Sequence, residues 1–394
     1  MKKFLLIDAI DFTKPIFGSG GASVVSSVLR FFKGNVYLVG ITSENHQLGV
    51  WSKITIDSQE FHFLPIITSK QLLEPKLGAA NIDFAFNLFK FRKALIKTDT
   101  NRVFTQTYSV LWCLFFIKNN WGICFYYPGL GNPMLIGRKP MIGRYLSHLY
   151  DFLQGIAIRN VQIAFAAASQ QQIDSYNRFL KKIYTMTVVK MLPTAVDMTL
   201  FKPQDKYQAR LDIGISQKSL VLCFVGRLAF VKGIPLILEA LKIIIQNNSN
   251  AKLLLVGDGE ERHNLVKLVD SLELNNNILF LGNIKPSHVA LAIAAADVCV
   301  VSSFTEGFSC AMVEQVACGR PIVSTNVSGA QDLIMEGVNG YIVNDRDPGI
   351  FAQKILDASR LIDVEDYSVQ LVQEKYSVEQ LWQTIDQQWL ASEE

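Results

Sequence analysis

Short β-branched and aromatic segments alternate with longer segments of helical period along the whole chain. Such alternation is typical of βαβ units, in which helices join the parallel strands of a sheet. In the first half it predicts strands over residues 4–10, 36–39, 61–66, 103–105, 123–127, 163–167 and 187–190. In the second half it predicts strands over 220–225, 252–256, 278–281, 298–301, 321–324 and 340–343, with the clearest helices over 234–245, 287–295 and 308–317. The expected class is α/β with parallel sheets.

The length of the chain indicates two domains, since 394 residues exceed what one hydrophobic core usually serves. The strand pattern stops at Pro193 and starts afresh after the irregular stretch that ends at Pro203. We therefore expect a first domain over residues 1–192 and a second over 193–376. The last segment, 377–394, has a helical pattern that is compatible with packing on the first domain.

No segment is apolar over a length that predicts a membrane span, and the most apolar one, 289–301, contains Asp297. The start carries two lysines but lacks a small-residue cleavage site, so we interpret it as a buried strand. The six cysteines form no CxxC pair, which is the usage of reduced, buried thiols. The expected location is the cytoplasm.

Charge is divided unevenly between the two halves. Residues 1–190 hold 22 Lys and Arg against 10 Asp and Glu, whereas the remainder holds 16 against 25. A basic half joined to an acidic half indicates that one of them faces an anionic partner. We do not expect nucleic acid, because the basic half has no helix-turn-helix pattern and no aromatic strand motif.

The first of three motifs in the second half reads Gly-Arg-Leu-Ala-Phe-Val-Lys-Gly, from Gly226 to Gly233. A strand ends just before it, and a helix is expected to start near Lys232. Arg227 and Lys232 would then lie at the carboxyl edge of a parallel sheet, where open α/β folds bind ligands. Two cations beside a helix amino terminus suit a diphosphate, although taken alone they are more typical of solvated surface charges.

The second motif, Val-Gly-Asp-Gly at residues 256–259, is a glycine turn after another strand. It does not complete the GxGxxG fingerprint of dinucleotide-binding domains, because Arg262 occupies the last glycine position. We therefore do not expect NAD binding.

The third motif, Ser-Phe-Thr-Glu-Gly-Phe-Ser-Cys-Ala-Met-Val-Glu, runs from Ser303 to Glu314 and is the most specific. Its loop holds Glu306, and a helix is expected to begin at about Phe308, so that its first backbone N–H groups point at an anion. Glu314 lies in the second turn among apolar residues, where an unpaired carboxylate is costly. A carboxylate there suits the two hydroxyls of a ribose. The alternative is a loop carboxylate and a solvated helix residue.

These three motifs resemble those of the retaining glycosyltransferases of family four, motif by motif over residues 219–345 and more loosely over the first half. The resemblance implies the GT-B fold, which consists of two facing Rossmann-like domains with a cleft between them. It also implies a metal-independent enzyme of the hexosyltransferase type (EC 2.4). Its donor would be a nucleoside-diphosphate sugar, which is a substrate and not a cofactor, and transfer would retain the anomeric configuration.

The resemblance also assigns roles to single residues. Arg227 and Lys232 would hold the leaving diphosphate, Glu306 would contact the donor sugar, and Glu314 would bind the ribose. Fixed cations aimed at a leaving group that gains charge lower the barrier of such a transfer. The other donor contacts would come from Gly20, Gly21, Gly226, Asn283, Ile284, Gly307, Phe308, Ser309, Cys310 and Ala311.

Two features depart from the family pattern or compete with it. Pro128 stands where many members have a histidine, which leaves the acceptor-side polar contact unassigned, with His148 as the nearest candidate. Asp345 and Asp347 form the DxD pattern of metal-dependent transferases. We interpret this pattern as structural, because Asp347 and Pro348 make a good N-cap and first helical residue, and we expect no metal site.

The segment 82–97 mixes aromatic residues with four cations. Four of its apolar residues fall on one helical stripe, whereas Phe86 and Phe89 lie off it. Together with the cations Arg138, Lys139 and Arg144, this segment fits docking on anionic lipid headgroups, at the inner face of the plasma membrane. A core helix with a solvated basic rim is an equal alternative.

The expected function is sugar transfer to a glycan or lipid-linked acceptor, in bacterial-type surface polysaccharide or glycolipid assembly, with the donor held by the second domain and the acceptor by the first. A sugar-nucleotide epimerase or hydrolase on the same fold would need more acid and base groups than five histidines offer. A non-catalytic GT-B subunit is disfavoured because Arg227, Lys232, Glu306 and Glu314 are all present, although Pro128 mildly favours it.

Overall fold

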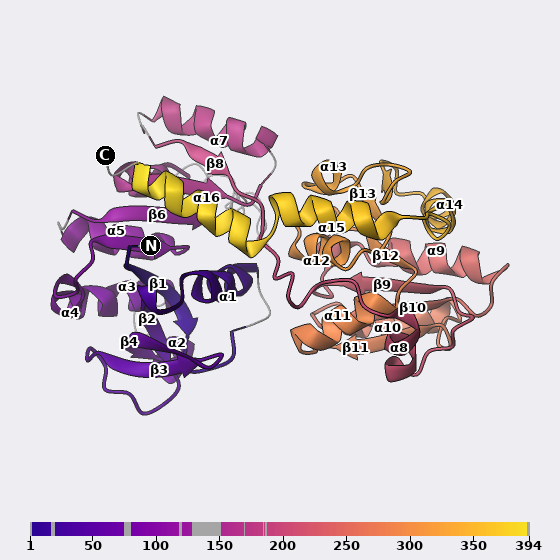
Figure 1. The fold of residues 1–394 in the computed structure, drawn as a ribbon, viewed down its shortest axis with the longest axis horizontal. Coiled ribbons are helices and arrows are strands. Elements are labelled where there is room, and N and C mark those ends of the chain that lie inside the picture. The colour runs from indigo at the N-terminus through magenta and orange to yellow at the C-terminus, as the bar shows by residue number, and fades with distance from the viewer. Residues whose placement is uncertain are drawn as a thin grey trace. The chain divides into compact units, whose positions relative to one another are not determined.

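The computed structural model describes residues 2–16, 20–74, 80–117, 120–127, 151–168, 170–183, 185 and 187–391. It divides into two compact units, Met1–Pro193 with Trp382–Glu394 and Thr194–Leu381. Each unit contains one sheet with helices packed on it (Figure 1).

The first unit contains an eight-stranded sheet within the described residues. Its strands are β1 (Phe4–Asp11), β2 (Val36–Thr42), β3 (Ser52–Ile56), β4 (Gln59–Thr68), β5 (Arg102–Thr105), β6 (Gly122–Tyr127), β7 (Ile163–Ala166) and β8 (Val189–Met191). They lie in the order β3-β4-β2-β1-β5-β6-β7-β8. Leu5 on the central β1 pairs with Tyr37 on one side and with Val103 on the other, both in parallel register. All seven predicted strands of this half are confirmed, with ends that differ by up to three residues.

The hairpin of β3 and β4 corrects the expectation of an all-parallel sheet, since these two strands pair antiparallel. Its turn residues Asp57 and Ser58 have φ angles of 47° and 64°, and two such residues in a row suit a two-residue hairpin loop. The sequence pattern that marks β3 is the alternation of Ile54 and Ile56 with polar residues. We did not predict this strand because its apolar residues are few.

Helices cover the sheet of the first unit and bury its apolar residues. They are α1 (Gly20–Phe32), α2 (Ser69–Leu73), α3 (Ala80–Lys90), α4 (Arg92–Ile96), α5 (Tyr108–Ile117) and α7 (Gln170–Lys182), with the 3₁₀ turns η1 (Lys33–Asn35) and η3 (Ile158–Asn160). Ile7, Phe84 and Phe125 are fully buried in the core between these layers. The predicted single helix over 82–97 is wrong in one respect, because Phe91 separates α3 from α4.

The last helix, α16 (Val378–Ala391), packs its tryptophans on the first unit. The indole N–H of Trp382 donates to Ser27 Oγ at 2.8 Å, and both groups are buried. The buried guanidinium of Arg102 lies 4.0 Å from the ring centroid of Trp389 and forms an ion pair with Asp386 at 3.5 Å. These contacts hold α16 on the first unit. The helical pattern of residues 377–394 is compatible with this position.

The second unit contains a six-stranded parallel sheet within the described residues. Its strands are β9 (Val221–Val225), β10 (Lys252–Val256), β11 (Ile278–Gly282), β12 (Val298–Val301), β13 (Ile322–Thr325) and β14 (Gly340–Val343). Its helices are α8 (Lys206–Ile213), α9 (Pro235–Ile245), α10 (Arg262–Ser271), α11 (Pro286–Ala295), α12 (Cys310–Ala317), α13 (Ala330–Leu333), α14 (Pro348–Ala358) and α15 (Val364–Lys375), with one 3₁₀ turn, η4 (Phe230–Lys232). All six strands are confirmed to within one residue at each end.

The strand order of the second sheet, β11-β10-β9-β12-β13-β14, decides where a ligand site can form. The chain runs outward from β9 to β11 and then returns to the other side of β9 to form β12. The order of the strands therefore reverses between β9 and β12. Open α/β sheets bind their ligands at the carboxyl ends of the strands beside such a reversal.

No helix in the part of the chain that the structure describes is long and apolar enough to cross a membrane.

Candidate functional site

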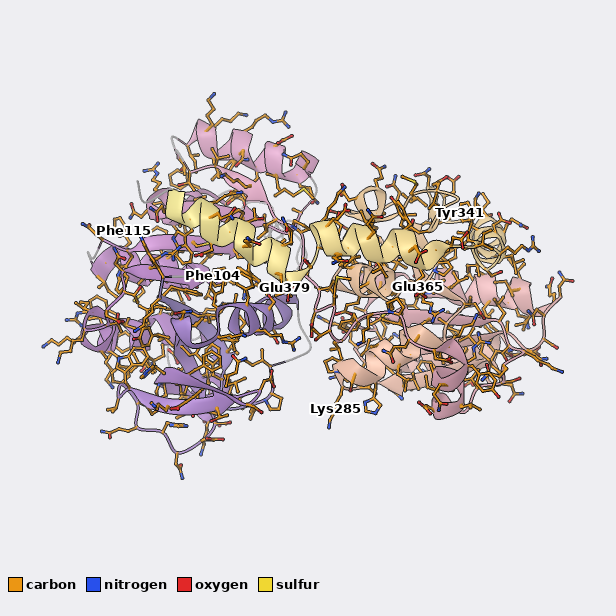
Figure 2. The ribbon with its side chains drawn as sticks, in the orientation of Figure 1. Phe104, Phe115, Lys285, Tyr341, Glu365 and Glu379 are labelled. Carbon is orange, nitrogen blue, oxygen red and sulfur yellow. The ribbon has the colours of Figure 1, made fainter. Side chains whose placement is uncertain are left out.

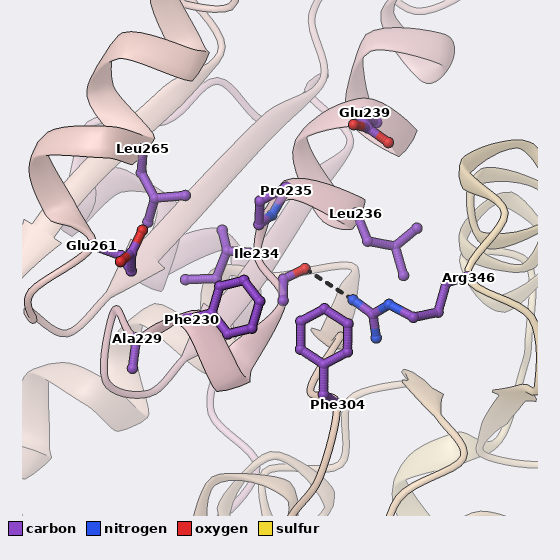
Figure 3. A pocket seen from close by; sticks show the side chains of 11 residues that line it. Ala229, Phe230, Ile234, Pro235, Leu236, Glu239, Glu261, Leu265, Phe304 and Arg346 are labelled. Carbon is purple, nitrogen blue, oxygen red and sulfur yellow. Dashed lines mark hydrogen bonds between the residues drawn. The ribbon is translucent and has the colours of Figure 1, made fainter. Parts of the chain in front are cut away.

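Two loops leave the sheet at the reversal of strand order and carry half of the predicted site residues. The loop after β9 begins at Gly226 and contains η4, and the loop after β12 runs from Ser302 to Ser309. The backbone N–H of Phe304 donates to the carbonyl of Val231 at 2.8 Å, which joins the two loops directly. Beside them lies a cavity of about 230 Å³, whose lining includes Phe230, Phe304 and Arg346 (Figure 3).

The loop after β9 depends on close packing between two glycines. Gly226 and Gly257 have φ angles of 154° and 125°, and a Cβ on Gly257 would collide with the carbonyl of Gly226. The Val-Gly-Asp-Gly turn therefore supports the neighbouring loop through its backbone. The predicted helix start near Lys232 is wrong by a few residues: η4 ends there, Gly233 adopts a left-handed conformation (φ 58°), and α9 begins at Pro235.

Lys232 and Glu306 are in contact at the centre of the site. The ammonium of Lys232 lies 2.6 Å from Glu306 Oε1, and Ser303 Oγ donates to the same oxygen at 2.6 Å. The two side chains are only 21% and 11% exposed, so the pair is largely shielded from water. An ion pair of this kind is sensitive to geometry, because each partner compensates the lost hydration of the other.

Arg227 is placed differently from Lys232. Its guanidinium makes two hydrogen bonds to Glu260, at 3.0 and 2.7 Å, and points into solvent. This pairing raises the pKa of Arg227 and lowers the pKa of Glu260. Glu260 was not predicted, although its place after β10, the neighbour of β9, could have indicated it. In this conformation the carboxylate of Glu260 occupies two of the guanidinium donors that the sequence prediction assigned to a diphosphate.

The residues Gly307 to Ala311 surround the amino end of α12. Ser309 is the N-cap, but its side chain makes no capping hydrogen bond, so the first N–H groups of α12 stay available to an anion. Phe308 is buried against Tyr376, and its carbonyl accepts from Thr194 Oγ1 at 3.2 Å. The helix begins at Cys310, two residues later than predicted.

Glu314 is half-buried on α12, with Met312 and Val313 fully buried beside it. Among the described residues no hydrogen-bond or ion-pair partner of its carboxyl group is found. Burial raises the pKa of Glu314 to about 8. A carboxyl group in this state lacks the donors that would stabilise its ionised form.

The other predicted contacts lie on separate elements. Gly20 and Gly21 are the first residues of α1, and the carbonyl of Gly21 accepts from Gln106 Nε2 at 3.1 Å. Asn283 is exposed and Ile284 half-buried, directly after β11. Pro128 and His148 lie outside the described residues.

The DxD pattern of Asp345 and Asp347 is used as a helix cap. Asp347 accepts from the N–H of Ile350 at 2.8 Å, and Pro348 is the first residue of α14, which confirms the predicted cap. Within the described residues, no group of three or more His, Cys, Asp or Glu side chains is arranged to hold a metal ion.

A family model described as glycosyl transferases group 1 matches residues 205–369. The second unit is a glycosyl transferases group 1 domain. This match confirms the resemblance that the motifs of the second half indicated, and it includes the Lys232–Glu306 pair, Glu314 and the amino end of α12.

Two curated relatives share part of this sequence. The D-inositol 3-phosphate glycosyltransferase of Segniliparus rotundus is 29% identical over 164 residues, 41% of this chain and 36% of that protein. The N-acetyl-alpha-D-glucosaminyl L-malate synthase of Bacillus anthracis is 33% identical over 147 residues, 37% of this chain and 38% of that protein. The similarity thus spans less than two fifths of the length of these relatives.

Solved structures resemble the whole chain. Sucrose-phosphate synthase from Thermosynechococcus elongatus has a TM-score of 0.73 at 18% identity, and the match covers 99% of this chain and 100% of that one. HepE of Anabaena in complex with UDP-glucose has a TM-score of 0.70 at 16% identity, with the same coverage. At such identities the likeness shows the fold. The group 1 domain and the first unit together have the two-domain α/β architecture of GT-B proteins, as the resemblance implied.

Glu314 predicts how the stability of the group 1 domain depends on pH. Because its pKa is about 8 in the folded chain and near 4.5 when unfolded, the folded state binds an extra proton between these values. Unfolding free energy should therefore decrease as pH rises from 5 to 8, by on the order of 2–4 kcal/mol from this group. We expect Glu314→Gln to remove this decrease in urea unfolding at pH 5 and pH 8.

The matched control is Glu239→Gln, which changes an exposed carboxylate on α9 of the same unit and should keep the wild-type dependence on pH. An identical pH dependence in Glu314→Gln and the wild type would show that the Glu314 carboxyl is already ionised at neutral pH.

Proposed function

We propose that this chain is a retaining glycosyltransferase that moves a sugar from a nucleoside-diphosphate sugar to a glycan or lipid-linked acceptor. The observation that carries the proposal is the contact of Lys232 with Glu306 beside the amino end of α12, where the strand order reverses. A cation, a row of backbone N–H groups and a nearby carboxylate on α12 are the groups that a diphosphate and a ribose require.

The donor we propose is a uridine diphosphate sugar. HepE, which shares the fold over nearly the whole chain, was solved with UDP-glucose. In the present chain, Lys232 and the first N–H groups of α12 would hold the diphosphate, and Glu314 would accept from the ribose hydroxyls. Glu306 would contact the sugar, and Arg227 would turn from Glu260 to the phosphates.

The chemistry we propose needs no protein nucleophile. The bond between the sugar C1 and the phosphate oxygen breaks, and its electron pair stays on the diphosphate, where Lys232 and Arg227 stabilise the added charge. The acceptor oxygen bonds to C1 on the same face, and its proton passes to the leaving phosphate oxygen. Sugar and diphosphate thereby separate with retention at the anomeric carbon.

The acceptor side of the proposal rests on the first unit. Residues 1–190 carry 22 Lys and Arg against 10 Asp and Glu, which suits an anionic acceptor or the surface that presents it. Gly20 and Gly21 at the start of α1 remain proposed donor contacts from this unit. We propose a bacterial-type surface polysaccharide or glycolipid as the product and the cytoplasmic side of the membrane as the place of synthesis.

A screen of UDP-, GDP- and ADP-sugars by thermal stabilisation, followed by product formation, tests the donor proposal. We expect UDP-sugars to raise the Tm of the wild type in a concentration-dependent manner. Lys232→Ala should lose most of this shift and lower kcat by about 10²–10³-fold, since it removes a fixed charge at the leaving group. Lys242→Ala, which removes a partly exposed lysine of α9, is the control and should behave like the wild type. Equal shifts in Lys232→Ala and the wild type would contradict the placement of the diphosphate.

We further propose that α3, α4 and α5 of the first unit dock on an anionic membrane. Of the predicted stripe, Phe84, Leu88 and Leu95 are buried and Phe91 is half-buried, whereas Phe86, off the stripe, is 60% exposed. The neighbouring helix α5, which packs on α3, exposes Phe115 and Phe116 by 54% and 63%. Figure 2 shows Phe115 at the edge of the first unit. Arg92 lies 4.4 Å from the ring centroid of Phe89. Exposed aromatic rings beside cations suit the boundary between headgroups and acyl chains. The cations Arg138, Lys139 and Arg144 lie outside the described residues.

Cosedimentation with vesicles tests this surface. We expect binding to vesicles that contain phosphatidylglycerol, weaker binding at high salt, and little binding to phosphatidylcholine alone. The double variant Phe86→Ser and Phe115→Ser should reduce binding several-fold, whereas Leu211→Ser, at an exposed leucine of α8 in the second unit, should not. A double variant that sediments like the wild type would exclude this surface.

A further inference from the structure

Arg346, the middle residue of the DxD pattern, has a role that neither the motif nor the helix cap explains. Its guanidinium donates to three backbone carbonyls, those of Ser302 at 2.9 Å, Ser303 at 3.4 Å and Gly233 at 3.4 Å. Figure 3 shows Arg346 beside Phe304, with its bond to the carbonyl of Gly233 dashed. In the described part of the chain, Arg346 has no carboxylate within ion-pair distance. The hydrogen bonds of the Arg346 side chain therefore go to backbone carbonyl groups and not to an acidic side chain.

The three carbonyls belong to the two loops of the proposed donor site. Gly233 directly follows Lys232, and Ser303 Oγ donates to the Glu306 oxygen that Lys232 contacts. A further bond, from Ser302 Oγ to the carbonyl of Lys232, measures 2.8 Å. The guanidinium thus connects the backbone on both sides of the Lys232–Glu306 contact.

An aromatic stack extends this connection. The guanidinium lies 3.8 Å from the ring centroid of Phe304, and Phe304 stacks on Phe230 with centroids 5.3 Å apart and an interplanar angle of 18°. Phe230 and Phe304 come from the two different loops, and both rings are exposed. Because exposed rings gain little free energy from burial, this pair of rings is stabilised mainly by the ring–ring contact and by the contact of Phe304 with the planar guanidinium.

The backbone of both loops packs closely against the side chain of Arg346. A Cβ on Gly233 would collide with Nη2 of Arg346 and with the carbonyl of Ser302. Partial burial lowers the pKa of Arg346. Ser302 is buried, so loss of the guanidinium would leave its carbonyl short of a donor, whereas the carbonyl of Ser303 would keep its hydrogen bond from Thr325 Oγ1 at 2.8 Å. The two terminal nitrogens of the planar guanidinium reach carbonyls of both loops at once, Nη1 in one loop and Nη2 in the other, whereas a lysine has a single nitrogen.

We propose that Arg346 is a positioning residue that fixes the two loops in the geometry that Lys232 and Glu306 need. The role in catalysis rests on the proposed function, whereas the role in loop geometry does not. Arg346 touches neither Lys232 nor Glu306 through a side-chain bond, and it acts through the backbone next to them.

Hydrogen exchange measured by mass spectrometry tests the loop geometry without any activity. In Arg346→Ala, peptides covering residues 226–233 and 302–309 should exchange at least about tenfold faster than in the wild type, with the rest of the second unit unchanged. Arg346→Lys keeps the charge and the stem but not the planar group, and we expect it to show the same local increase. Unchanged exchange in both loops, or an increase throughout the unit, would overturn the proposal.

Transfer kinetics test the catalytic part. We expect Arg346→Ala to lower kcat by about 10- to 100-fold with a smaller change in the KM of the donor. The reason is that displacement of Lys232 and Glu306 reduces the stabilisation of the transition state more than it reduces the binding free energy of the donor. Free guanidinium at a non-denaturing concentration should restore activity to Arg346→Ala but not to Lys232→Ala.

The matched control is Lys354→Ala, which removes a cation 4.5 Å from the ring centroid of Tyr341 and should leave both readouts unchanged. Wild-type kinetics in Arg346→Ala would overturn the catalytic role. A wild type that transfers no sugar from any donor would instead contradict the proposed function, and hydrogen exchange would still decide the role of Arg346 in the loops.

Discussion

The contact between Lys232 and Glu306 joins the two loops that leave the second sheet where its strand order reverses, and the geometry of the candidate site depends on it. Both side chains are largely shielded from water, so neither would be stable in this place without the other. The backbone bond from Phe304 to Val231 and the guanidinium of Arg346 keep the loops close enough for the pair to form. The strand order, the contacts between the loops and the opposite charges thus together place Lys232 beside Glu306.

Charge in the site is balanced by the protein itself. Lys232 is paired with Glu306 and Arg227 with Glu260, while the carboxyl of Glu314 has a raised pKa and, among the described residues, no partner. Under the proposed function, an incoming diphosphate takes the place of the two carboxylates, and the ribose supplies the donors that Glu314 lacks. Binding would then be linked to the loss of a proton below about pH 8, because it favours the ionised form of Glu314.

The sequence allowed most of the fold to be predicted, because buried parallel strands are continuous apolar runs that stand out between helices. It did not reveal β3, whose alternation of Ile54 and Ile56 is short, or the break at Phe91. Motif spacing predicted Lys232, Glu306 and Glu314 as site residues, and the structure brings Lys232 and Glu306 into contact. Glu260 and Arg346 were not predicted, because their roles arise from contacts between loops 33 and 44 residues apart in sequence, which no local pattern records.

A structure of this chain in complex with UDP tests the central claim most directly. The account predicts that the diphosphate lies within hydrogen-bond distance of Lys232 Nζ and of the first N–H groups of α12, with the ribose hydroxyls at Glu314. It would be contradicted by a nucleotide bound elsewhere while Lys232 and Glu306 remain paired as they are now.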